Sequence, residues 1–262
     1  SHVSIEYGLT GATFTTSTAC SSANHAIGQA FWLIRQGTLD AAIAGGSEAP
    51  ICNGNLKAWE AMRVVAPDTC RPFSKDRSGM ILGEGGAMFV LEEMEAAMKR
   101  GAKIYGEVAG FGMSADAHHL TMPLVQGAAK AVKAALDDAS LVPEDIRYIN
   151  AHGTATQAND PMEANAIRSV FGDRADDIPV SSTKSMHGHT LGAAGAIEAA
   201  ATVLGMYYSV LPPNANFTEI DPECRVNVIA NEAREGSINA AISNSFAFGG
   251  LNAVLAFKRF AD

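Results

Sequence analysis

Hydrophobic and polar positions along the chain follow two periodicities. Apolar residues recurring every three or four positions predict helices, and short runs of β-branched and small apolar residues predict strands. The predicted helices cover residues 22–36, 56–62, 92–100, 128–140, 160–171 and 193–208. The predicted strands cover residues 12–18, 39–46, 85–91, 104–111, 146–150, 178–181, 240–245 and 252–257. Because helices and strands alternate throughout, we expect a layered α/β fold.

An irregular stretch interrupts this pattern at residues 66–79, where proline, aspartate and serine are too frequent for a regular element. Its residues Arg71, Lys75 and Arg77 form a local basic cluster in an acidic chain. Most such clusters are simply solvated, and a docking patch for an acidic partner is the alternative.

The chain of 262 residues is long enough to bury a large core, as one large domain or as two closely packed halves. A second unit begins near Lys103, where a new strand follows the glycine that ends the preceding helix. We therefore expect two units, residues 1–100 and residues 101–262.

The composition excludes several classes of protein. A net charge of −9 argues against a nucleic-acid-binding protein, which needs a basic surface to neutralise phosphates. No apolar run is long enough to cross a bilayer, and no signal peptide is recognisable. The four cysteines, Cys20, Cys52, Cys70 and Cys224, lie far apart without metal-finger spacing, which indicates a cytoplasmic chain with free thiols.

Cys20 lies at the turn between the predicted strand 12–18 and the predicted helix 22–36. Unpaired backbone N–H groups and the helix dipole favour the thiolate there, so we expect a depressed pKa and a nucleophilic cysteine. A small cysteine packed beneath the helix is the alternative that this turn alone leaves open.

Two histidines lie in tight loops directly after predicted strands. His152 belongs to the segment NAHGTAT, and His189 belongs to KSMHGH. Loops at the ends of strands are where open α/β sheets place their sites, although each histidine could simply satisfy local backbone groups. A zinc site built on His187 and His189 is a weaker interpretation, because no third ligand stands at a recognised spacing.

Four motifs together resemble those of one enzyme family. They are TACSSA around Cys20, NAHGTAT around His152, SSTKSMHGH followed by LGAAGAIE, and SNSFAFGG near the C-terminus. In this order and spacing they resemble the β-ketoacyl–acyl carrier protein synthases, in particular the type II elongation enzymes of bacterial fatty acid synthesis. The resemblance implies a thiolase-like fold of two similar α/β halves stacked as five layers, α-β-α-β-α.

The resemblance also implies roles for individual residues. Cys20 matches the nucleophile that accepts the acyl chain from a carrier-protein thioester. His152 and His189 match the pair that drives decarboxylation of the malonyl extender unit, as two neutral imidazoles that donate N–H groups to the enolate oxygen. The backbone N–H groups of Cys20 and Phe248 correspond to the oxyanion hole.

Further matched residues surround this centre. Lys184 and Glu198 correspond to an active-site pair expected to hold His189 and to set the local field, and Glu163 corresponds to another acidic residue close to the site. The hydroxyls expected near the phosphopantetheine arm, and the expected aromatic gate, are Thr154, Thr156, Phe246 and Phe248.

The resemblance implies no resident cofactor or metal, because the phosphopantetheine arm arrives with the acyl carrier protein. The implied partners are this carrier, malonyl and acyl thioesters and a second copy of the chain in a homodimer. Since the chain starts only a few residues before the Cys20 strand, we expect a fragment: the end of the N-terminal half plus the complete C-terminal half. The absent portion, as a separate polypeptide, is then a further expected partner.

The chain departs from the family pattern close to the gate and arm. His187 replaces a small or β-branched residue, and Ala247 and Leu251 replace a common Gly and Thr, which puts substrate preference in doubt. SFAFGGLN together with DAHH at 116–119 resembles the nodulation-associated and specialised-lipid branch more than the housekeeping enzyme.

Two other functions remain as alternatives. A thiolase-type acyltransferase needs a second reactive cysteine near the C-terminus, for which only Cys224 is available, outside any fitting motif. A non-catalytic chain-length or interaction partner typically lacks the nucleophile, whereas Cys20 is present. An inactive fragment is the third possibility.

Overall fold

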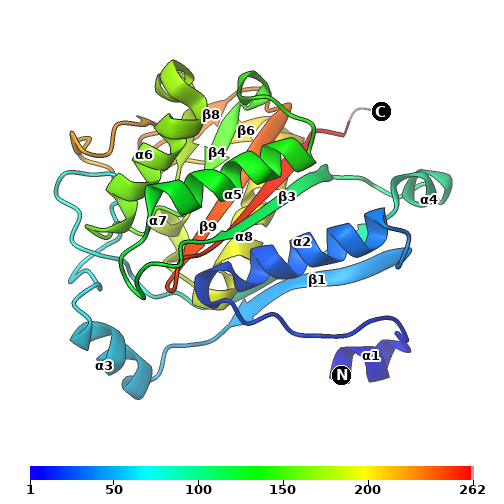
Figure 1. Cartoon of the computed structure of the whole chain (residues 1–262). Helices are drawn as coiled ribbons and strands as arrows, with labels where there is room; N and C mark the ends of the chain where they lie inside the picture. The colour runs from blue at the N-terminus through cyan, green and yellow to red at the C-terminus, as the bar shows by residue number, and fades with distance from the viewer. Residues whose placement is uncertain (261–262) are drawn as a thin grey trace.

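The computed structural model describes residues 1–260, and a six-stranded mixed sheet forms its centre (Figure 1). The order of its strands is β3–β10–β9–β4–β5–β7. β10 pairs antiparallel with β3 and with β9, while β9, β4, β5 and β7 run parallel. The bounds are β3 Glu107–Ala115, β4 Tyr148–Asn150, β5 Pro179–Ser181, β7 Asn227–Val228, β9 Ala240–Ala247 and β10 Leu251–Lys258.

The two faces of this sheet contribute to two separate hydrophobic cores. Along β10, Val254 and Ala256 belong to one core, and Ala253, Leu255 and Phe257 belong to the other. This alternation is the two-residue period of a strand that is buried on both faces. The central sheet therefore needs a helical layer on each side.

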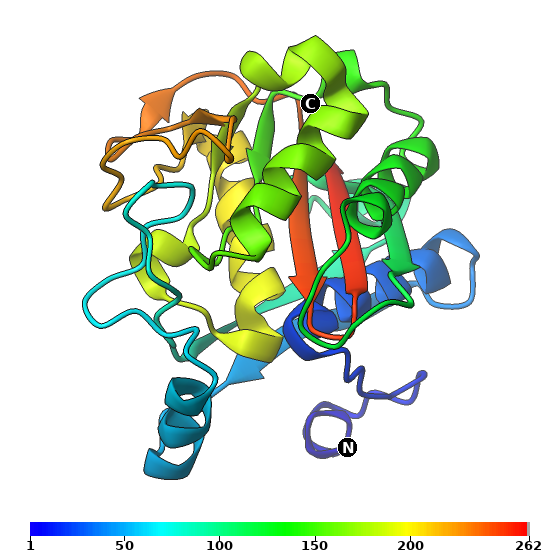
Figure 2. The ribbon, with the colours of Figure 1, turned by 60° about the vertical axis from the view of Figure 1, so that its left-hand side comes forward.

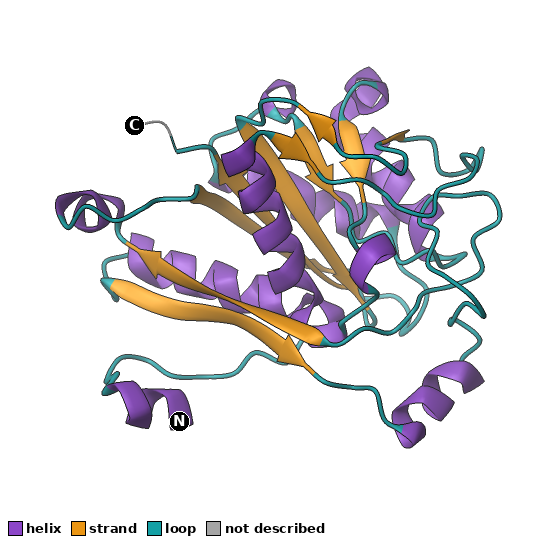
Figure 3. Cartoon of the chain, turned by 180° about the vertical axis from the view of Figure 1, so that it is seen from behind, coloured by secondary structure: helices purple, strands orange, loops and turns teal. Residues whose placement is uncertain are grey.

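Helices supply those layers. α5 (Val125–Asp138) packs on one face of the sheet with α6 (Asn159–Phe171) beside it, and α2 (Ser22–Arg35) and α8 (Ala194–Tyr208) cover the other. An antiparallel ribbon packs on the far side of α2 and α8 (Figure 3), formed by β1 (Ala41–Glu48) and β2 (Gly85–Glu92). The described residues thus stack in the order α-β-α-β, and no fifth layer occurs among them.

The middle position of α8 explains its composition. This helix contacts β9 on one side and β1 and β2 on the other. A helix enclosed between two sheets has no polar face to present to water, so it is apolar nearly all round. Its buried Glu198 is therefore an exception that needs a partner.

Shorter elements connect these layers. The remaining elements are α1 His2–Tyr7, η1 Ala19–Ser21, α3 Asn53–Ala61, α4 Met94–Lys99, η2 Pro143–Asp145, η3 Gly172–Asp176, α7 Lys184–His187, η4 Leu191–Ala193, β6 Val210–Leu211 and β8 Arg234–Glu235. α3 stands away from the body of the molecule (Figures 1 and 2). Within residues 1–260, no helix has the length and hydropathy needed to cross a membrane.

The predicted strand over 12–18 is wrong. In the structure this segment belongs to no sheet, and its hydrogen bonds are local: the Thr16 hydroxyl donates to the Ser22 carbonyl, and the Thr18 N–H donates to the Ser22 hydroxyl. β-branched residues favour an extended backbone, but a strand also needs a neighbouring strand to accept its hydrogen bonds.

The basic cluster of the irregular stretch divides in the structure: Lys75 is exposed, as a solvated charge would be, whereas Arg71 and Arg77 form ion pairs. Arg77 is buried and forms an ion pair with Asp221. Arg71 pairs with Asp68 at 2.8 Å. Asp68 belongs to the same stretch of sequence, whereas only the fold brings Asp221 to Arg77.

Candidate active site

Cys20 lies in η1, in the turn that leads into α2. The preceding residue, Ala19, has a φ of 49°, a left-handed conformation that alanine adopts only at a cost. The Thr18 carbonyl accepts hydrogen bonds from the N–H and the hydroxyl of Ser21, which hold the turn closed. Strain of this kind is often stored at functional sites, and in this turn it presents a nearly buried thiol, 8% exposed.

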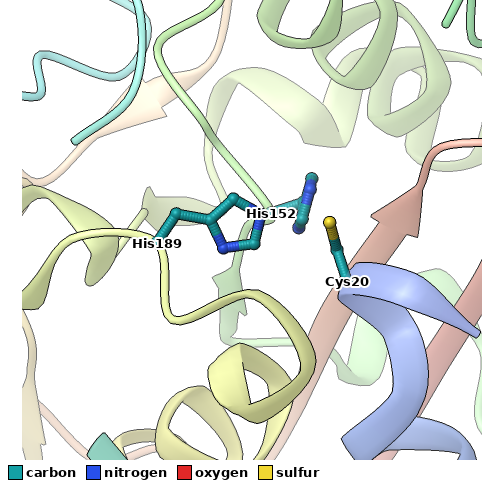
Figure 4. A group of neighbouring side chains, drawn as sticks. All are labelled: Cys20, His152 and His189. Atoms are coloured by element: carbon teal, nitrogen blue, oxygen red, sulfur yellow. The ribbon is translucent and has the colours of Figure 1, made fainter. Parts of the chain in front are cut away.

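Three side chains from distant parts of the sequence meet at this turn. The Sγ of Cys20 and a ring nitrogen of each of His152 and His189 all lie within 4.8 Å of one another (Figure 4). The two imidazole rings are nearly perpendicular, with centroids 5.4 Å apart. They come from the loop after β4 and the loop after α7, so the fold and not the sequence spacing joins them.

The loop that carries His152 needs a glycine at its next position. Gly153 has a φ of +34°, and a Cβ there would lie 2.5 Å from the Cβ of Ser182. Its carbonyl accepts a hydrogen bond from the Ser182 hydroxyl at 2.7 Å. Only glycine permits this close approach of the two loops.

The three side chains line a cavity of about 380 Å³. The predicted arm-binding hydroxyls, Thr154 and Thr156, also line it and lie 2.9 Å apart, and so do the predicted gate rings, Phe246 and Phe248. The cavity contains most of the residues expected to touch substrate, whereas Lys184, Glu198 and Glu163 lie behind its wall.

The expected depression of the Cys20 pKa is wrong. Burial raises the pKa of this thiol to about 11. The nearby Lys184 ammonium and the backbone N–H groups of Cys20 and Phe248 act in the opposite direction, but desolvation of the thiolate outweighs them. The backbone N–H groups of the turn do lower the pKa of the thiol, as expected, but burial raises it by more.

The two backbone N–H groups expected to form the oxyanion hole do converge on the sulfur. Those of Cys20 and Phe248 each lower the pKa of the thiol by hydrogen bonding. One N–H belongs to η1 and the other to the residue after β9. Donors in this arrangement can stabilise negative charge on the sulfur or on an oxygen beside it.

The proton positions on the two histidines follow from their hydrogen bonds. Lys184 donates from Nζ to Nδ1 of His152 at 3.2 Å, and the Leu191 N–H donates to Nδ1 of His189 at 3.2 Å. With Nδ1 acting as acceptor, each neutral ring carries its hydrogen on Nε2. Within residues 1–260 neither Nε2 has a protein partner, and both rings line the cavity.

Both imidazoles are kept neutral. Burial lowers the pKa of His152 well below its usual value, and the Lys184 charge and His189 lower it further. Burial also lowers the pKa of His189 well below its usual value, with the Lys184 charge next in importance. The cavity therefore receives two neutral N–H donors, which suit a developing enolate oxygen.

The same cysteine and two histidines form a donor set typical of zinc. The hydrogen bonds argue against a metal ion at this point, because a metal ligand must offer a lone pair and each Nε2 carries a proton. The Lys184 cation beside His152 also opposes a second cation. His187, part of the weaker zinc interpretation, bonds to the Thr183 hydroxyl through Nε2 at 3.1 Å and lines no part of the cavity.

Glu163 holds the His152 loop from below. Its Oε1 accepts from the His152 N–H at 2.8 Å, and its Oε2 accepts from the Gly153 N–H at 2.7 Å. The Asn244 amide donates to Oε1 at 3.0 Å. Burial raises the pKa of this carboxyl, and these donors lower it. Because both of its oxygens accept hydrogen bonds from the backbone of the His152 loop, the geometry assigns Glu163 to positioning.

Lys184 and Glu198 form a fully buried ion pair. The sequence interpretation expected this pair to hold His189, but the ammonium contacts the other histidine, at its Nδ1 and at its carbonyl oxygen (2.6 Å). Burial raises the pKa of Glu198 to about 7, although Lys184 lowers it.

Sequence reasoning missed several residues of the cavity wall. They include Trp59, Met62, Arg63, Met80, His119, Leu120, Thr121, Gln157 and Asn159. His119 belongs to the DAHH segment, which indicated a branch of the family and not the cavity, and the other residues carry no motif that points inward. Trp59 was detectable only as one of two tryptophans in the chain.

Comparisons with known proteins give one consistent family. The model for the beta-ketoacyl synthase N-terminal domain matches residues 1–97, and that for the C-terminal domain matches residues 105–218. Nodulation protein E of Rhizobium sp. (strain N33) is 54% identical over 257 residues, covering 98% of this chain and 64% of the relative. The 3-oxoacyl-[acyl-carrier-protein] synthase 2 of Staphylococcus aureus (strain COL) is 43% identical over 265 residues, with the same shares of the two chains.

A solved structure shows the same fold. It is a type II polyketide synthase acyl carrier protein in complex with its ketosynthase, with a TM-score of 0.96 and 35% identity. The match covers 99% of this chain and 66% of that one. This similarity confirms the thiolase-like α/β architecture predicted from the sequence. The chain spans slightly less than two thirds of the length of the relatives it matches.

Proposed function

Because the chain belongs to the beta-ketoacyl synthase family, we propose that it catalyses decarboxylating condensation of an acyl thioester on Cys20 with malonyl-acyl carrier protein, as a 3-oxoacyl-[acyl-carrier-protein] synthase. The observation that carries the proposal is the convergence of one thiol and two neutral imidazoles on a single cavity. Both family models support it, as do the names of the relatives.

The first step transfers the acyl chain. The Sγ of Cys20 attacks the carbonyl carbon of the incoming thioester, the bond from that carbon to the pantetheine sulfur breaks, and the thiol proton passes to the leaving sulfur. Charge on the carbonyl oxygen falls between the backbone N–H groups of Cys20 and Phe248. These donors offset part of the penalty that burial imposes on the thiolate.

The second step uses the histidines. Loss of CO₂ from the malonyl group leaves an enolate, whose oxygen accepts hydrogen bonds from Nε2 of His152 and of His189. Its terminal carbon then attacks the acyl carbonyl on Cys20, the new carbon–carbon bond forms, and the Cys20 sulfur leaves and regains a proton. No resident cofactor is required, because the carrier protein brings the phosphopantetheine arm.

Acyl carrier protein is the proposed protein partner. A ketosynthase of the same fold is known in complex with its carrier protein. Thr154 and Thr156 at the cavity wall offer hydroxyls to the arm.

We also propose that the protein forms a homodimer, which sedimentation velocity would check. We propose a cytoplasmic location as well, which the four free cysteines support.

Greater identity to nodulation protein E than to the fatty acid enzyme supports a specialised lipid pathway. Condensation rates measured with an acyl carrier protein of fatty acid synthesis and with one of a specialised lipid pathway would test this choice. A preference for the housekeeping carrier would contradict it.

The test of the reaction uses Cys20→Gln. We expect this variant to lose condensation and to keep malonyl decarboxylation, measured as CO₂ release, because the histidines perform that step. In the same background, replacing His152 or His189 by alanine should lower decarboxylation by about 100- to 1000-fold, the usual cost of losing an oxyanion donor. Condensation that persists in Cys20→Gln would refute the mechanism.

A further inference from the structure

The hydrogen bond that orients the His189 ring comes from the backbone and not from a side chain. The Lys184 ammonium holds Nδ1 of His152. Nδ1 of His189 instead accepts from the Leu191 N–H at 3.2 Å. Leu191 has a left-handed φ of 46°, which its β-carbon disfavours. A strained turn of this kind persists only where neighbouring groups hold it, so the surroundings of Leu191 determine how the ring is bonded.

A carboxylate from a distant strand holds the next residue of this turn. Oε2 of Glu48, the last residue of β1, accepts from the Gly192 N–H at 3.2 Å, across 144 positions of the chain. β1 approaches the turn closely, because a Cβ on Gly46 would lie 3.1 Å from the Cα of Ala193. Glu48 is half-buried and lies outside the cavity wall, so it is placed to hold the backbone and not to touch substrate.

The two N–H groups concerned lie at the beginning of a helix, since η4 runs directly into α8. The first N–H groups of a helix have no acceptor within it, and the helix dipole favours a carboxylate there. The Leu191 N–H donates to His189, and the adjacent Gly192 N–H donates to the carboxylate. Only the φ and ψ of Leu191 separate the two groups, so anchoring the second restricts the direction of the first.

We propose that Glu48 is a positioning residue for His189. By holding the Gly192 N–H, its carboxylate keeps the Leu191 N–H directed at Nδ1, and this bond keeps the ring hydrogen on Nε2, which is available to the cavity. The inference deepens the proposed function and rests on it, because a hydrogen on Nε2 matters only if an enolate oxygen forms beside it. If Glu48 merely anchored the start of α8, it would stabilise the fold without affecting the ring.

The first experiment records the tautomer of His189. Two variants remove the charge of Glu48 at nearly constant size: Glu48→Gln keeps an oxygen that can accept from Gly192, and Glu48→Met replaces it with a thioether, a much weaker acceptor. In long-range ¹H–¹⁵N spectra, assigned with His189→Gln, we expect the Nε2–H form in wild type and in Glu48→Gln. Glu48→Met should show a new Nδ1–H population at His189 alone, because Lys184 still holds the His152 ring.

The second experiment measures decarboxylation of malonyl-pantetheine in the Cys20→Gln background, as CO₂ release. Loss of the positioning bond should lower kcat about 10-fold in Glu48→Met and change KM by less than about 2-fold, because the contact acts on the ring and not on substrate. Glu48→Gln should retain most of the rate. The matched control is Glu84→Met, which removes an exposed carboxylate that accepts the Ile51 N–H of the loop after β1 at 3.0 Å and should leave kcat unchanged.

The outcomes separate this inference from the proposed function. A Cys20→Gln protein that releases no CO₂ overturns the proposed function, and the inference with it. CO₂ release together with an unchanged His189 tautomer in Glu48→Met overturns the inference alone. An equal loss of kcat in Glu48→Gln and Glu48→Met also overturns it, since the cause would then be charge or packing. If Glu48→Met fails to fold, Glu48→Asp, which shortens the reach by one methylene, must show the same Nδ1–H population for the inference to stand.

Discussion

Lys184 donates a hydrogen bond to Nδ1 of His152 at a point where neither side chain has appreciable contact with solvent. That bond places the ring hydrogen on Nε2, the nitrogen available to the cavity. The lysine thus acts on the proposed enolate through the histidine, without touching substrate. Its buried partner, Glu198, balances the charge that makes this arrangement possible.

We expect Lys184→Met to lower the free energy of unfolding by about 3–5 kcal/mol, because the buried Glu198 loses its partner and must either keep an uncompensated charge or take up a proton. The double variant Lys184→Met/Glu198→Gln should recover part of this loss, as measured by urea denaturation. A double variant whose loss equals the sum of the two single losses would contradict direct coupling.

Both site histidines should remain neutral when the pH falls below 6.5, since their pKa values are lowered well below that value. Long-range ¹H–¹⁵N spectra should show the Nε2–H form of each ring at pH 6. The unfolded chain takes up these protons near pH 6.5 and the folded chain does not, so the two histidines make stability fall as the pH drops through 6.5. Spectra of a charged ring at pH 6, assigned with His152→Gln and His189→Gln, would contradict this arrangement.

The alkylation of Cys20 should be slow at neutral pH and strongly pH-dependent. With a pKa of about 11, the thiolate fraction, and with it the rate with iodoacetamide, rises about tenfold per pH unit between pH 7 and 9. Peptide-level mass spectrometry separates Cys20 from the exposed Cys52, and Cys20→Ala provides the control. A rate at Cys20 that levels off below pH 8 would indicate an activated thiolate instead.

Arg77 should matter far more for stability than its neighbour Lys75. Arg77 is buried, pairs with Asp221 and lies 3.9 Å from the fully buried Asp160, so Arg77→Met leaves a buried carboxylate without its cation and should cost about 3–5 kcal/mol. Lys75 is exposed and lies 4.0 Å from Glu219, so Lys75→Met should change stability by less than about 0.5 kcal/mol. Equal thermal shifts for the two variants would contradict this difference.

Much of the fold could be predicted from the sequence because its periodicity is strong. The helix predicted at 22–36 is observed at Ser22–Arg35, and the helix predicted at 193–208 at Ala194–Tyr208. These helices are long, and their apolar positions or capping residues are distinct. The strand predicted at 12–18 failed because strand formation depends on a neighbour that the local sequence cannot reveal.

The sequence by itself determined which residue types were available at the site, because TACSSA and the two histidine segments each carry a local chemical signature. Only the tertiary structure decided their electrostatic state. The pKa of Cys20 depends on how completely the surrounding layers exclude water, and the tautomer of His152 depends on a lysine 32 positions away. Burial and pairing sum over neighbours that the fold gathers from the whole chain, so no local pattern encodes them.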